Sequence, residues 1–169
     1  MRIAFRLFLV LSLVAGIAQI LVWYQSLPEQ VPFHFGVQGL PDAWSGRHSV
    51  TLLYSGLHIA NFLFFGLLAY GIKFIPNSAI NIPNKEYWLA PGRRPEVMAF
   101  NANLLIFIGI ATHWLLTGLF QLSSLVAIKR RDSIEPEFWW IFGIYLAAVL
   151  GACIYLMLKF RKPATLEAN

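Results

Sequence analysis

Three residues that could together bind a metal ion lie in one segment, 27–48. His34, Asp42 and His48 belong to the residue types that ligate zinc, and a divalent site needs three such groups to converge. Their spacings, of eight and six residues, match no standard metal-binding signature. Two interpretations follow: a metal site, or hydrogen bonds from His34 and Asp42 to backbone groups that hold the segment in shape.

Two further histidines, His58 and His113, lie within long apolar stretches. Histidine can ligate metals and titrates near neutrality, so this pair could form a metal pair, a proton relay or a catalytic base. The apolar stretches contain no aspartate or glutamate, and the chain has no H-E-x-x-H sequence. We therefore favour interhelical hydrogen bonding that fixes helix register. The missing intramembrane carboxylate argues against a proton-coupled transporter.

The elements that hold these residues are predicted to be membrane helices. Of the 169 residues, 58% are hydrophobic and 12% are charged, whereas a soluble domain carries about 25% charged residues. A bilayer core about 30 Å thick requires roughly 20 apolar residues per helix. The sequence therefore predicts an all-α membrane protein: a four-transmembrane-helix bundle forming one integral membrane domain, 1–169. The expected spans are about 5–25, 50–72, 103–127 and 138–158.

Polar residues within the spans are expected to face the bundle interior, because lipid-facing positions are apolar. At helical spacing they form three stripes: Ser12, Gly16 and Gln19; Tyr54, His58 and Asn61; and His113, Thr117 and Ser124, with Gln121 at the edge. The fourth span carries Gly143, Ala147 and Gly151, a ladder of small residues that permits close helix approach. Asn101 and Asn103 interrupt the start of the third apolar stretch, which we expect at the membrane interface.

The first loop is predicted to be compact and extracytoplasmic. Alternation of Val31, Phe33 and Phe35 indicates a short strand with His34 on its other face. Gly36 and Gly39 can adopt the positive φ angles of a sharp return. The loop then continues as extended chain into a turn at Asp42, with Trp44 back on the membrane interface.

The second loop contains the basic and aromatic segment 81–94. Its aromatic side chains suit headgroup depth, and its cations suit anionic lipid. The alternative is a docking surface for a cytoplasmic protein or an anionic ligand, with Arg93 and Arg94 binding a carboxylate or phosphate.

Charge distribution predicts the orientation of the chain. Nine Lys and Arg residues lie on the side of the termini and the second loop, against four on the other side. Both termini are therefore expected in the cytoplasm. Because the basic residues flank the apolar stretches and form no stripe, we expect no nucleic-acid partner.

The segment Leu27–Trp44 carries the pattern L-P-x-x-V-P-x-H-F-G-x-x-G-x-P-D-x-W. Over about residues 8–60 the chain resembles the N-terminal domain of unknown function of SdpI-like bacterial membrane proteins, and segment 81–94 resembles a stretch of their relatives. The resemblance implies a multi-pass protein of the bacterial cytoplasmic membrane. A well-known relative confers immunity to a secreted toxin and sequesters a repressor. This chain is shorter and lacks the G-x-R-T-P-W segment, so those roles are analogies.

Three functions are ranked on these grounds. The first is a non-enzymatic sensing or binding protein, with a peptide or protein ligand at the outer loop, a cytoplasmic or membrane partner, and no cofactor. Its candidate binding residues are His34, Asp42, Trp44, Arg93 and Arg94. The second is a small subunit of a larger membrane complex or transporter. The third is a metal-dependent hydrolase that uses His34, Asp42 and His48.

Overall fold

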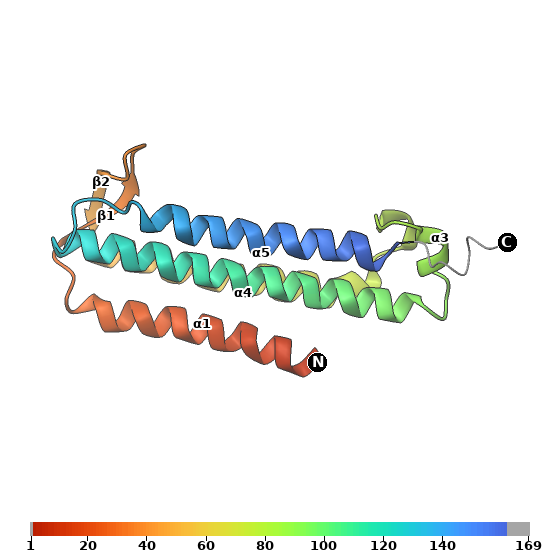
Figure 1. Ribbon diagram of the computed structural model, residues 1–169. Helices are drawn as coiled ribbons and strands as arrows, with labels where there is room; N and C mark the ends of the chain where they lie inside the picture. The colour runs from red at the N-terminus through yellow and green to blue at the C-terminus, as the bar shows by residue number, and fades with distance from the viewer. Residues whose placement is uncertain (1, 162–169) are drawn as a thin grey trace.

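The computed structural model describes residues 2–161 and is mainly helical (Figure 1). Each of its four long helices is long and apolar enough to cross a membrane. The predicted all-α, four-helix membrane protein is therefore confirmed. The long helices are α1 (Arg2–Tyr24), α2 (Arg47–Gly71), α4 (Arg94–Ala127) and α5 (Glu137–Lys159).

Helix α4 is the centre of the bundle. It packs against α1, α2 and α5, and α1 and α2 also pack against each other. Figure 1 shows α4 running between α1 and α5. Within the described residues, the extensive helix contacts of α5 are with α4. Helices α1, α2 and α4 thus form a three-helix unit, and α5 lies against one side of it.

Helix α4 begins earlier than the expected third span. It is continuous over 34 residues from Arg94, so the start that was expected to be interrupted is helical. Pro95 lies in its first turn, where a proline favours helix initiation. The Asn101 side-chain amide donates to the carbonyl of Val97 at 2.9 Å. This polar side chain is therefore satisfied within the helix.

The loop between α1 and α2 forms a two-stranded antiparallel sheet of β1 (Gln30–Phe35) and β2 (Pro41–Gly46). The expected strand at 31–35 is present. Asp42, however, lies in β2 and not in a turn, because segment 41–46 pairs with β1 from Phe35↔Pro41 to Gln30↔Gly46. The return between the strands has a positive φ of 67° at Gly39.

The connection between α2 and α4 contains two short 3-10 turns, η1 (Ile72–Phe74) and η2 (Asn77–Ala79), and the short helix α3 (Lys85–Trp88). It packs against the end of α5 around the buried ring of Phe160. The Asn84 amide and the Trp88 indole N–H both donate to the carbonyl of Phe160, at 2.9 and 3.1 Å. The connection is thereby fixed to the bundle.

The hairpin lies at one end of the bundle (Figure 1). The start of α1, helix α3 and the end of α5 lie toward the other end. This arrangement places the two unequal groups of basic residues at opposite ends. Lys162, one member of the larger group, lies outside the described residues.

Candidate functional site

The base of the hairpin is fixed to the three-helix unit. Val31 is fully buried in a cluster with residues of α1, α2 and α4, which are Ile20, Val50, Tyr54, Phe120 and Ala127, together with Leu27. The Ser123 hydroxyl of α4 donates to the carbonyl of Pro32. The Arg47 guanidinium donates to the carbonyl of Leu27 at 2.9 Å. The hairpin is therefore part of the folded bundle.

The tip of the hairpin is fixed to the segment between α4 and α5. The carbonyl of Gly39 accepts a hydrogen bond from the N–H of Ile134 at 3.0 Å. The Ser133 hydroxyl donates to the carbonyl of Gln38 at 3.1 Å. A Cβ atom on Gly39 would lie 2.6 Å from the Ser133 hydroxyl oxygen. Both the positive φ and this contact require glycine.

Replacing Gly39 with alanine is expected to detach the hairpin tip, because left-handed backbone at a non-glycine residue costs about 1–3 kcal/mol and the new methyl meets Ser133. Backbone amide exchange of the hairpin should accelerate, while that of α2 stays unchanged. The matched control is Gly92→Ala, since no atom lies within 4 Å of a Cβ there. Equal exchange in both variants would show that the tip is not docked in this way.

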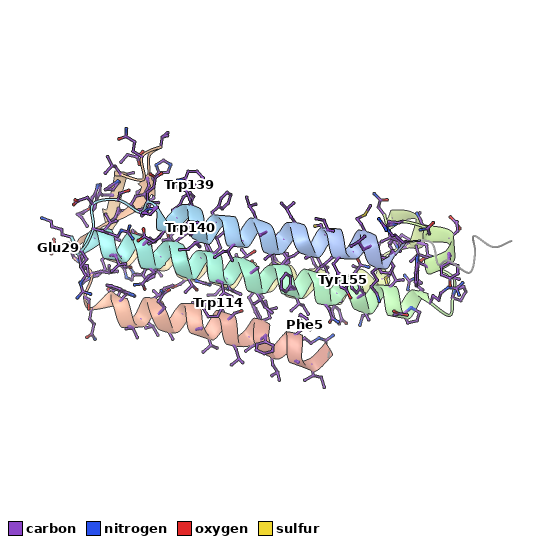
Figure 2. All side chains as sticks on the ribbon, viewed as in Figure 1. Phe5, Glu29, Trp114, Trp139, Trp140 and Tyr155 are labelled. Carbon is purple, nitrogen blue, oxygen red and sulfur yellow. The ribbon has the colours of Figure 1, made fainter. Side chains whose placement is uncertain are left out.

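Between the docked hairpin and the start of α5 lies a cavity of about 470 Å³, which we term the hairpin cavity. Ligand pockets are typically about 300–1,000 Å³, largely apolar, with a few polar groups. Its walls carry the aromatic side chains of Phe33, Phe35, Tyr54, Phe138 and Trp139, and its polar groups include His34 and Glu135. The Trp139 indole N–H donates to the Glu135 carboxylate at 2.8 Å. Figure 2 shows Trp139 at the hairpin end of α5.

His34 and Asp42 meet across the hairpin, with their Nδ1 and Oδ1 atoms 2.6 Å apart. They bond each other and not the backbone groups that the sequence suggested. His48 lies in the first turn of α2, and no group of three metal-ligating side chains forms anywhere in residues 2–161. The trio expected for a metal-dependent hydrolase is therefore not assembled. Trp44 lies on β2, opposite Pro32, and is not among the residues that line the hairpin cavity.

The intramembrane candidates all take part in hydrogen bonds between helices. His58 of α2 and His113 of α4 are fully buried, with their Nδ1 atoms 2.8 Å apart. The Asn61 amide donates to the carbonyl of Gly109 at 2.9 Å. The Gln19 amide donates to the side-chain oxygen of Gln121 at 2.9 Å. These bonds join α1 and α2 to α4, as expected of polar groups that fix helix register.

The histidine pair fixes the protonation pattern of its own rings. When both rings are neutral, one Nδ1 must donate and the other must accept. One Nε2 atom is then an acceptor and the other a donor, and neither has a hydrogen-bond partner within the described residues. The pair holds α2 against α4 and offers no third ligand for a metal.

Small residues let the helices approach closely at some of the expected positions but not at others. A Cβ on Gly16 would lie 2.4 Å from the His58 ring, and a Cβ on Gly109 would lie 2.9 Å from Phe65. At Gly143 and Gly151 of α5, by contrast, no atom lies within 4 Å. The predicted small-residue ladder of α5 is therefore not used for packing within the described residues.

The two arginines of the second loop stabilise that loop. Arg93 donates to the carbonyl of Tyr87 at 2.9 Å, and its guanidinium lies 3.8 Å from the centre of the Tyr87 ring. Arg94 donates to the Asn77 side chain at 2.9 Å and to the carbonyl of Ile75 at 2.7 Å. Both side chains are thus bonded within the second loop, and the binding of a carboxylate or phosphate by Arg93 and Arg94 stays a prediction.

Of the cavity residues outside the first loop, Tyr54 was expected to face the bundle interior but not to line a cavity, and Phe138 and Trp139 were not singled out. The run of aromatic residues that opens α5, 138–140, was a signal that a second segment could supply aromatic walls. Only the hairpin docking shows which of them face the cavity.

A family model described as a domain of unknown function, DUF1648, matches residues 7–56. The matched region contains most of α1, the whole hairpin and the beginning of α2. It supplies one wall of the hairpin cavity, and segments outside the match supply the other. Comparison with curated proteins and with solved structures gives no match.

Proposed function

We propose that this chain is a non-enzymatic binding protein of the bacterial cytoplasmic membrane, with its termini in the cytoplasm and its hairpin cavity on the outer side. The hairpin cavity carries the proposal, because it combines a volume of about 470 Å³ with aromatic walls. The unequal basic residues at the two ends support the orientation, since cytoplasmic flanks are enriched in Lys and Arg.

The chemistry of the cavity favours an apolar segment of a peptide as the ligand. Aromatic walls bury aliphatic and aromatic side chains effectively. The His34–Asp42 pair and the Glu135 carboxylate supply polar groups to the cavity and its surroundings, which suits a backbone or an amine. The resemblance to SdpI-like proteins supports a secreted peptide and an immunity-type role.

The test compares two adjacent tryptophans. Trp139 lines the hairpin cavity, whereas Trp140 does not and is 71% exposed. Figure 2 shows both at the same end of α5. The full chain in lipid nanodiscs is titrated with a panel of labelled synthetic peptides rich in Leu, Trp and Lys. We expect Trp139→Ala to weaken binding about 30-fold, as for an anchor worth about 2 kcal/mol.

Trp140→Ala should change the dissociation constant by less than about twofold, the expectation for a residue outside the binding core. Equal losses in the two variants would place binding elsewhere on the aromatic end of the bundle. Failure of every peptide to bind the native chain would contradict a peptide ligand.

A further inference from the structure

A second cavity, at the end of the bundle opposite the hairpin, is lined by basic side chains. It has a volume of about 280 Å³ and lies between α1, α2 and α4. Arg6, Lys73 and Arg94 contribute to its lining, and we term it the cationic crevice. Figure 1 shows the start of α1 lying short of the start of α4. The first turns of α4 are thus left uncovered by α1 on that side.

The charges of the cationic crevice have no carboxylate partner within residues 2–161. Within the described residues, the Lys and Arg ion pairs join Lys159 to Glu96 and Arg131 to Glu137, and none involves a residue of the cationic crevice. Arg94 bonds neutral oxygen atoms, and the Lys73 ammonium lies 4.0 Å from the centre of the Tyr70 ring. Two of the three cations are therefore held in place while their charge stays uncompensated.

The cationic crevice continues into an apolar groove. A neighbouring cavity of about 280 Å³ shares Arg6, Ala69 and Ile106 with it. The remaining lining of this groove comes from α1 and α2 and is uncharged: Leu9, Val10, Phe62, Gly66 and Tyr70. No aspartate or glutamate lines either cavity. The basic side chains of the cationic crevice therefore lie beside an apolar groove between α1 and α2.

We propose that the cationic crevice binds the headgroup of an anionic phospholipid, with one acyl chain in the groove between α1 and α2. The three uncompensated cations complement the phosphodiester of an anionic phospholipid, whose negative charge no headgroup cation neutralises. The groove gives the acyl chain an apolar surface that a free phosphate ion could not use. This site shares no lining residue with the hairpin cavity. The outcome of one test therefore does not decide the other proposal.

The test uses native mass spectrometry of the full chain in detergent. The probes are phosphatidylglycerol and phosphatidylcholine with identical acyl chains, and inorganic phosphate. We expect phosphatidylglycerol to bind at least about tenfold more tightly than phosphatidylcholine, since each basic residue near an anionic headgroup contributes severalfold. The Arg6→Gln/Lys73→Gln variant should lose this preference. Arg94 is left unchanged because it also fixes the second loop.

The matched control is Lys129→Gln/Arg130→Gln, which removes the same charge from the hairpin end and should keep the preference. Ala69→Phe fills the shared part of the two cavities without changing any charge, and it should weaken phosphatidylglycerol binding. Equal binding of the two lipids, or an equal loss in both charge variants, overturns the proposal. Phosphate binding as tight as that of the lipid, unaffected by Ala69→Phe, would indicate a free-anion site instead.

Discussion

Replacing Gly16 with alanine is expected to destabilise the bundle by about 2 kcal/mol, the typical cost of forcing an extra methyl group into a packed core. The added Cβ would lie 2.4 Å from the His58 ring, which is itself fully buried. The Nδ1 atom of this ring is bonded to His113 at 2.8 Å, so moving the ring aside breaks that bond, and we expect α1 to move away from α2. The free energy of unfolding, measured in detergent or bicelles, should fall accordingly.

The control is Gly56→Ala, because nothing lies within 4 Å of a Cβ at that position of α2. Alanine is the better helix former by up to about 1 kcal/mol, so this variant should be neutral or slightly stabilised. A Gly16→Ala protein as stable as the control would mean that α1 does not approach His58 closely.

The buried histidine pair predicts a second large effect, with a characteristic non-additivity. His58→Leu or His113→Leu alone leaves a buried imidazole without its partner, at a cost of about 1–3 kcal/mol. Replacing both with leucine removes both polar groups, so the double variant should be more stable than either single variant. The coupling should reach about 1–2 kcal/mol, the upper end for hydrogen bonds between membrane helices.

The four proteins of this cycle are compared by their free energies of unfolding. Strictly additive losses would contradict a direct His58–His113 bond. The peptide titration supplies an independent readout, since the pair does not line the hairpin cavity. Unchanged peptide binding in a stable double variant is expected of a pair that acts through helix register.

The fold class was predictable because it rests on the length of each apolar stretch and on the absence of charged residues within it. Both are properties of local composition alone. The polar stripes that face the bundle interior were also predictable, because residues three or four positions apart share a helix face. Gln19, His58, Asn61 and His113 all lie in bonds that join helices. The sequence did not predict which helix each polar stripe would contact. That choice depends on how four helices of similar length and composition pack against one another.

The hairpin cavity could not be predicted because its walls come from segments about 100 residues apart. Phe35 and Trp139 line the same cavity in a structure whose hairpin tip is bonded to Ile134. Small residues were equally ambiguous: Gly16 lies against a ring, whereas Gly143 faces open space. The same residue type supports packing in one place and exposure in the other, and only tertiary contacts separate the two.

The lateral position of α5 has a consequence for the biogenesis of the protein. Helices α1, α2 and α4 hold their mutual hydrogen bonds without it, so the three-helix unit can assemble while α5 is still being synthesised. The hairpin cavity, however, needs Phe138 and Trp139. The proposed binding cavity is therefore completed last, when the start of α5 has taken its place beside the hairpin.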